Sequence, residues 1–128
     1  MSVPAPDPTA PDPAAPDPAA LNLAPLLDVR GVQRAGVVDG DGQILNMVGS
    51  GATDPTIVAA ARAVLQSLQA ATDSPSWHDL LLDLDSGPLL LMPCGAGMLL
   101  VRFDEVPSLG RVRLGVRRVL AQAQAAGE

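Results

Sequence analysis

The sequence predicts an α+β domain in which helices pack against a five-stranded antiparallel sheet, in the order α-β-β-α-β-β-β-α. The first observation is that short apolar runs, separated by turns rich in Gly and Asp, alternate with two longer segments of helical periodicity. The second is that residues 1–19 are dominated by Pro, Ala and Asp and offer little for a core. We therefore expect a disordered tail over 1–19 and one domain over 20–128.

The N-terminal segment contains an Ala-Pro-Asp-Pro repeat, at 5–8, 10–13 and 15–18. Proline at this density favours extended polyproline II, which predicts a stiff, solvated tail. The alternative is a docking ligand for a groove of the SH3 or WW kind.

The first half of the domain reads as a helix, a hairpin and a second helix. Leucines over 21–29 form a short apolar stripe, interrupted by Pro25. Runs at 32–38 and 43–48 flank Asp39-Gly40-Asp41-Gly42, as in a hairpin. Asp54 and Pro55 open a helix that should end near Ala71. Its expected sheet-facing stripe is Ile57, Ala61, Val64, Leu65 and Leu68.

The second half reads as three strands and a last helix. Runs at 77–84, 88–93 and 97–103 are joined by tight turns, which predicts an antiparallel meander. The last helix should start at Pro107-Ser108 and continue to about Ala125. Its apolar face is expected to be Leu109, Val112, Val116, Val119, Leu120 and Ala123, and its solvated face Arg111, Arg113, Arg117 and Arg118.

Composition excludes several classes of function. The net charge is -6 and no Lys is present, so nucleic acid is not expected as a partner. No apolar run approaches the roughly 20 residues of a membrane span, so no stable membrane insertion is expected. A single cysteine and the lack of a signal-peptide pattern favour the cytoplasm.

No catalytic, metal or cofactor site is expected either. One His, one Cys, no Lys and no Tyr leave little acid-base chemistry, so the chain is not expected to be an enzyme. Cys94 has no second thiol or His cluster to complete a metal site. A calcium loop starting at Asp39 would need Glu at its twelfth position, which is Ser50. Gly49-Ser50-Gly51 lacks the Lys of a phosphate-binding loop and is read as a hinge.

Two surfaces are candidates for a protein interface. The outward face of the middle helix is small and uncharged, and the strand at 77–84 is apolar enough that it would need a partner strand if it lay at a sheet edge, which is where the family resemblance described below places it. Alternation places His78, Leu80 and Leu82 on one face of that strand and Trp77 on the other. Helix propensity of Ala and burial of the leucines in the core are the alternatives. The candidate residues are Ala59, Ala60, Ala63, Ser67, Ala70, Trp77, His78, Leu80 and Leu82.

The element order over 21–126 resembles the roadblock/dynein light chain family, which has a profilin-like fold. Residues 29–42 look like its first hairpin, where a strand of small residues enters an Asp-x-x-Gly turn. Residues 107–113, with the Leu109-Gly110 pair, look like the start of its last helix. Pro25 and the proline-rich tail depart from the family pattern.

The resemblance implies a dimeric adaptor or regulator of the bacterial type that partners a GTPase. Its expected partners are a second copy of itself, a related roadblock subunit, and a Ras-like small GTPase, whose hydrolysis it would stimulate or which it would scaffold. The alternative is a small-molecule sensor, because folds of this kind can enclose a ligand between sheet and helices.

Overall fold

A computed structural model describes residues 21–49 and 55–126 of the chain. The expected tail over 1–19 and the Asp54 cap lie outside the described residues, as do Ser50 and Gly51 of the expected hinge.

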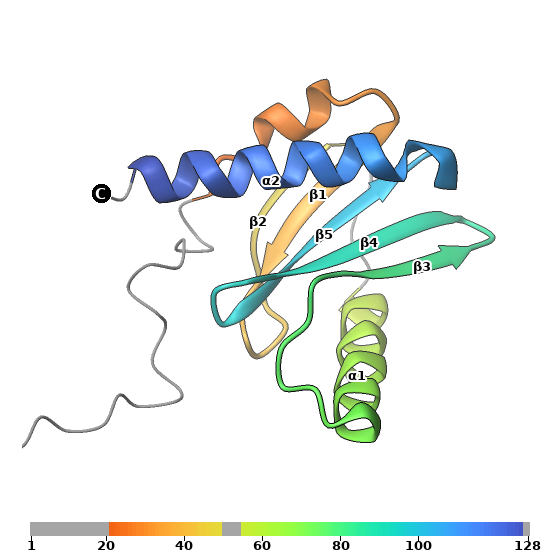
Figure 1. Ribbon diagram of the computed structural model, residues 1–128. Coiled ribbons are helices and arrows are strands. Elements are labelled where there is room, and N and C mark those ends of the chain that lie inside the picture. Colours follow the sequence, from red (N-terminus) through yellow and green to blue (C-terminus); the bar gives the residue numbers. More distant parts are fainter. Residues whose placement is uncertain (1–20, 50–54, 127–128) are drawn as a thin grey trace, which may run out of the picture.

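One five-stranded sheet forms the centre of the molecule, with strand order β2-β1-β5-β4-β3 (Figure 1). Every neighbouring pair of strands is antiparallel, as predicted. The strands are β1 (Val32–Val38), β2 (Ile44–Gly49), β3 (Leu80–Leu84), β4 (Gly87–Cys94) and β5 (Gly97–Phe103). The order leaves β2 and β3 as the two edges of the sheet.

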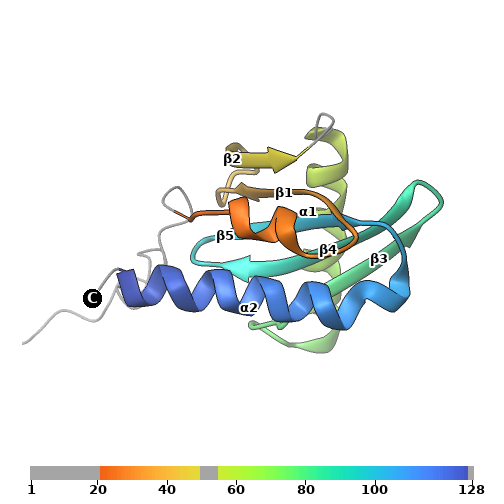
Figure 2. The same cartoon turned by 90° about the horizontal axis from the view of Figure 1, so that it is seen from above.

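Helices cover both faces of the sheet, as the view from above shows (Figure 2). Helix α1 (Pro55–Thr72) lies on one face. Helix α2 (Leu109–Ala126), preceded by the 3-10 turn η3 (Val106–Ser108), lies on the other together with η2 (Ala24–Asp28).

The first helix is a correction to the sequence prediction. Instead of an α-helix over 21–29, the structure has the five-residue 3-10 helix η2, with Pro25 in its first turn. Pro25 lacks the amide hydrogen that a longer helix would need for its backbone hydrogen bonds. The segment is held against the sheet by the side chains of Leu21, Leu23 and Leu26, which are all buried in the core. The remaining bounds agree with the prediction to within two residues, except that the strand expected from Trp77 begins only at Leu80.

The two faces of the sheet have separate hydrophobic clusters, because side chains alternate along each strand. On the α2 side, Leu90, Leu99 and Phe103 pack against Val112 and Val116. On the α1 side, Leu89, Leu91, Met98 and Leu100 pack against Val58 and Ala61.

Helix α2 presents the face that its sequence predicts. Val112, Val116 and Val119 are buried, and Leu109, Leu120 and Ala123 pack against them at the margin. Arg111, Arg117 and Arg118 are exposed. Arg113 is an exception to the expected solvated face, since it forms an ion pair with Asp79.

Candidate functional site

Helix α1 is held to the sheet by few side chains. Of its described side chains only Val58 and Ala61 are buried, with Ile57 and Leu65 partly buried beside them. Val64 and Leu68 are 43% and 47% exposed, so the expected sheet-facing stripe was wrong at these two positions. The helix is rotated so that Val58 faces the sheet and the apolar surface continues outward into solvent.

The outward face of α1 is small and uncharged, as the sequence predicted. Ala59, Ala60, Ala63, Ser67 and Ala70 are all exposed. The single charge of the helix, Arg62, turns away toward the β1–β2 turn, where its guanidinium donates a hydrogen bond to the Gly40 carbonyl oxygen. An exposed helix face without charge is typical of the centre of a protein interface.

The edge strand β3 continues this apolar surface. Leu80 and Leu82 are half-buried and pack against the cluster that contains Val58 and Ala61. Trp77 belongs to the same cluster, so its expected position on the opposite face was wrong. The reason is that residues 77–79 precede the strand and do not follow its alternation. His78 is exposed.

Asp79, which sequence reasoning passed over, joins this segment to α2. Its two carboxylate oxygens accept hydrogen bonds from Nε and Nη2 of Arg113 at 2.8 and 2.9 Å. The bidentate pair raises the pKa of the Arg113 guanidinium above its ordinary value, because the charged form donates both bonds. The pair therefore ties the approach to β3 to the opposite layer of the fold.

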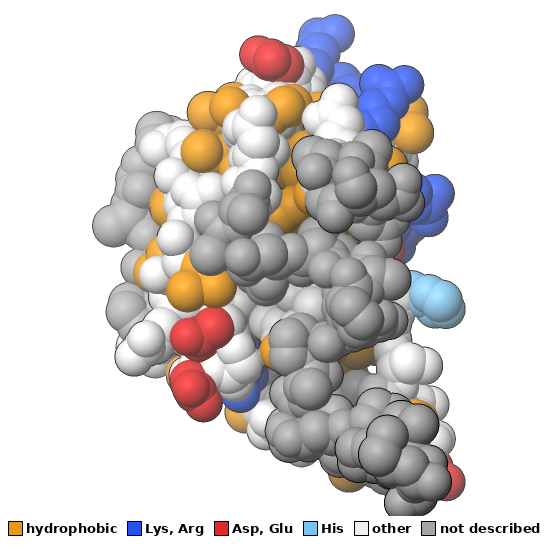
Figure 3. Space-filling view, turned by 90° about the vertical axis from the view of Figure 1, so that its left-hand side faces the viewer, with side chains coloured by type: hydrophobic (Ala, Val, Ile, Leu, Met, Phe, Trp, Pro, Cys, Tyr) orange, Lys and Arg blue, Asp and Glu red, His pale blue; other side chains and the backbone are white. Residues whose placement is uncertain are grey.

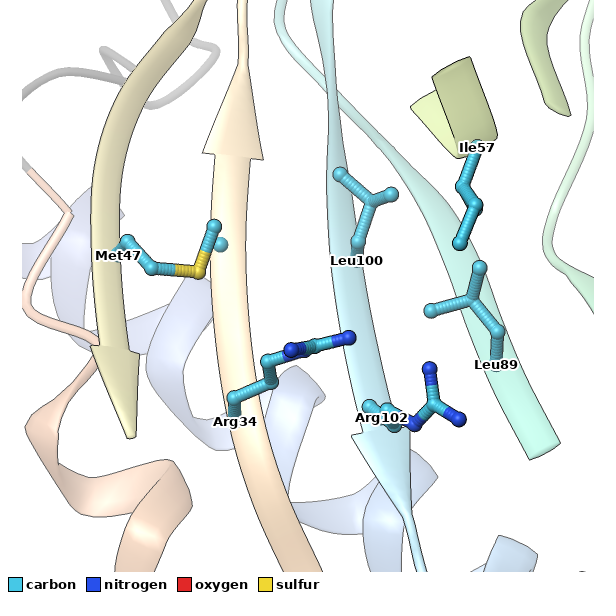
Figure 4. Close-up of a pocket in the computed structure, with 7 residues that line it drawn as sticks. Arg34, Met47, Ile57, Leu89, Leu100 and Arg102 are labelled. Carbon is cyan, nitrogen blue, oxygen red and sulfur yellow. The ribbon is translucent and has the colours of Figure 1, made fainter. Parts of the chain in front are cut away.

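A second feature that the sequence did not reveal is a pair of arginines beside the N-terminal part of α1. Arg34 of β1 and Arg102 of β5 are partners in the sheet register and lie side by side on the face of the sheet that α1 covers (Figure 4). Leu89, Leu100 and Ile57 lie next to them, around a hollow of only ≈ 20 Å³. Arg102 also donates a hydrogen bond to the Ser86 carbonyl oxygen in the β3–β4 turn. The hollow has room for a water molecule and not for a larger ligand.

A more open hollow of ≈ 180 Å³ lies where α1 meets the β1–β2 and β4–β5 turns. Polar side chains line much of it, with Trp77 on one wall. The lining includes Asp39, Arg62, Gln66, Gln69 and Trp77. If the domain were a small-molecule sensor, the alternative expected from the sequence, this hollow is where the ligand would bind.

The described residues give no support to a metal site. They contain no group of three or more His, Cys, Asp or Glu side chains that could hold an ion. The Asp39 run is a turn, since its Oδ1 accepts hydrogen bonds from the amides of Asp41 and Gln43 at 2.8 and 2.9 Å. Cys94 is buried. Within 21–49 and 55–126, neither helix is long and apolar enough to cross a bilayer.

Known proteins resemble this chain both in sequence profile and in structure. A sequence profile described as the Roadblock/LC7 domain matches residues 18–103. The gliding protein MglB from Thermus thermophilus has a similar structure, with a TM-score of 0.62 and 20% identity over 82% of this chain and 84% of that chain. An MglB in a tetrameric arrangement matches with a TM-score of 0.62 and 20% identity over 83% and 87%. A Roadblock/LC7 domain from Streptomyces avermitilis matches with 0.53 and 15% over 80% and 88%.

A search of curated proteins gives no match. At these sequence identities the structural likeness shows a shared fold and does not by itself show a shared function.

Proposed function

The chain belongs to the Roadblock/LC7 family, and from this premise we propose that it is a non-enzymatic adaptor of the cytoplasm that dimerises and binds a partner protein. The observation that carries the proposal is the uncharged, exposed face of α1, where Val64 and Leu68 stand beside Ala60, Ala63 and Ser67. We call this set the α1 face. A second copy of the chain is its first partner, because two-fold self-association is the commonest way to cover such a surface.

The edge strand β3 supports the same arrangement. Its outer side has backbone donors and acceptors without a neighbouring strand in the sheet, and pairing with another β3 would satisfy them. Leu84, at its end, is 41% exposed and extends the apolar surface. The structural similarity to an MglB in a tetrameric arrangement is consistent with self-association.

The first test is the solution mass of the full chain, measured by light scattering. We expect wild type at twice the 13.0 kDa chain mass and both Ala63→Arg and Val64→Arg at the mass of one chain. Two-fold symmetry brings the introduced charges together in a desolvated contact, which should weaken the dimer by about 100-fold or more.

Ala121→Arg is the matched control, because it adds the same charge at an exposed alanine of α2, on the opposite face of the sheet. It should leave the mass unchanged. Circular dichroism of each variant shows whether the fold is retained. A monomeric wild type, or an equal effect of all three substitutions, would exclude the α1 face as the contact between copies.

The further partner we propose is a Ras-like small GTPase, following the family resemblance. Calorimetric titration of the full chain with Ras-like GTPases from the same genome, loaded with GDP or a GTP analogue, should reveal one that binds. The chain alone should hydrolyse no GTP. A change in the GTPase's own hydrolysis rate would make the chain a regulator, and an unchanged rate with binding would make it a scaffold. Failure to bind any of them contradicts this part of the proposal and leaves the dimer standing.

The alternative of a small-molecule sensor rests on the ≈ 180 Å³ hollow beside Trp77. A ligand there would raise the melting temperature and change the Trp77 fluorescence, since Trp77 is the only tryptophan. A metabolite screen read by both signals separates this function from the adaptor function.

A further inference from the structure

Residues of η2, α2 and the segment after η2 line a groove of ≈ 400 Å³. Both η2 and α2 lie on the face of the sheet opposite α1 (Figure 2). Pro25, Val29 and Val119 give the groove an apolar floor. Gly115 lies close against the segment that follows η2, since a Cβ there would lie 2.7 Å from Cγ2 of Val29. Leu114, at the rim, is 47% exposed. The lining residues are Pro25, Asp28, Val29, Arg30, Arg111, Leu114, Gly115, Arg118, Val119 and Gln122.

The rim of this η2–α2 groove is basic although the chain as a whole is acidic. Arg30 stands on the η2 wall, and Arg111 and Arg118 stand on the α2 wall. Helix α2 contains four arginines and no acidic residue. In Figure 3 the basic side chains gather at the top and right of the view, the side of η2 and α2.

The acidic residues near the rim do not neutralise it. Asp28 lines the groove, and Asp104 lies close enough to Arg111 to interact with it electrostatically. Among the described residues, however, no carboxylate lies within ion-pair distance of Arg30, Arg111 or Arg118, in contrast to the Arg113–Asp79 pair. The groove therefore offers an apolar floor between cationic walls.

We propose that the acidic proline repeat of the same chain, residues 5–18, docks in the η2–α2 groove. This segment has three aspartates, at positions 7, 12 and 17, and no basic side chain. Its proline rings match the apolar floor and its carboxylates match the arginines. Proline-rich segments also lose little conformational entropy on binding, because the extended conformation is already favoured.

The position and length of the tail fit this occupant. The tail joins the domain at Leu21, which is buried in the same cluster as Val119 of the groove. In polyproline II each residue advances about 3.1 Å, so Asp17 can reach roughly 12 Å from Leu21 and Asp12 roughly 28 Å. Arg118 and Arg111 are about 10 Å apart along the helix axis, which this reach covers.

Arginines on both walls also suit the spacing of the repeat. A polyproline II helix has about three residues per turn, so carboxylates five residues apart point about 120° from each other. Arg30 on one wall and Arg111 and Arg118 on the other can meet carboxylates that point to opposite sides. Exposed ion pairs are weak individually, but a tethered segment has an effective concentration of about millimolar, so weak affinity suffices for docking.

Paramagnetic broadening in the full-length chain tests the proposal directly. A spin label placed by Ala14→Cys lies between Asp12 and Asp17, and Cys94, at 2% exposed, stays unlabelled. We expect the amide signals of Leu114, Gly115 and Arg118 to lose most of their intensity at low salt, while those of α1 keep theirs. Since the contact is between exposed charges, high salt should restore the signals.

Two pairs of variants make the result specific. Replacing the three tail aspartates by Asn should abolish the broadening, whereas Asp41→Asn, Asp73→Asn and Asp85→Asn, which remove as many exposed charges elsewhere, should not. Arg118→Gln should weaken it, whereas Arg117→Gln, its exposed neighbour outside the groove, should not. Broadening spread evenly over the domain, or insensitive to the tail substitutions, would overturn the proposal. Broadening that also appears when spin-labelled, unenriched chains are mixed with unlabelled, enriched chains would assign the tail to a second copy instead.

Discussion

At the scale of single residues, Asp104 makes the stability of the fold depend on pH. Its carboxylate accepts a hydrogen bond from Ser108 Oγ at 2.9 Å, and this bond, outweighing the opposing effect of desolvation, lowers the pKa of Asp104 below its usual value. The amide of Glu105, at 2.7 Å, and the charge of Arg111 act in the same direction. The folded state therefore prefers the ionised carboxylate.

The consequence for stability follows from that preference. A lowered pKa contributes stability above the ordinary carboxyl value, and this contribution is lost as the pH falls through the folded-state pKa. We expect Asp104→Asn to be less stable than wild type near neutrality, with the difference shrinking as the pH falls below the ordinary carboxyl pKa of 3.8 and disappearing once it passes below the lowered pKa of the folded state. Urea unfolding across this range measures it, and Asp85→Asn, an exposed aspartate, is the control. A difference that persists in acid would show that the asparagine disturbs the turn for another reason.

Single residues also show where sequence reasoning stops. The expected exposure of Ala59 and Ala63 follows from helical periodicity and is seen in the structure. The Asp79–Arg113 pair spans 34 positions, and the Arg34–Arg102 pair depends on which strands become neighbours. Neither can be read from a local pattern.

At the scale of elements, Gly115 sets the distance between η2 and α2. An alanine there would place its Cβ 2.7 Å from Val29, whereas at Gly110, in the same helix, nothing lies within 4 Å. Gly110→Ala should raise the free energy of unfolding by about 0.5–1 kcal/mol, because alanine is the better helix former. Gly115→Ala should lower it by about 1 kcal/mol, because overpacking exceeds that gain. Thermal or urea unfolding of both variants checks the opposite signs. Equal stabilisation would mean that η2 moves freely away from α2.

Elements with strong periodicity were the most predictable. Helix α2 has a single apolar stripe and buries it as expected. Helix α1 has apolar residues around more than half of its circumference, so its sequence allowed several orientations against the sheet. Tertiary packing selects the one that buries Val58 and Ala61 and leaves Val64 and Leu68 in solvent.

At the scale of the whole molecule, the sheet has two free edges and the proposed dimer uses only one. The sequence predicted five antiparallel strands, but the pairing of β1 with β5, which places β2 and β3 at opposite edges, is a long-range choice. Leu80 and Leu82 of β3 pack in the hydrophobic cluster beneath α1, so the apolar surface of α1 continues to the β3 edge. The β2 edge instead has a register shift at Leu45, which is left without a partner in β1. A bulge of this kind makes an edge a poor template for pairing.

This asymmetry can be tested with one proline at each edge. Asp83→Pro changes β3 opposite Pro88, which itself has no amide hydrogen to donate across the pair, and Leu45→Pro changes β2 at the position without a register partner in β1. In a two-fold β3 contact the change acts twice, and a backbone hydrogen bond contributes a net 0.5–1.5 kcal/mol or so. We therefore expect Asp83→Pro to raise the dimer dissociation constant about 10- to 100-fold and Leu45→Pro to leave it unchanged, as measured by analytical ultracentrifugation. The reverse pattern would move the dimer contact to β2 and separate it from the α1 face.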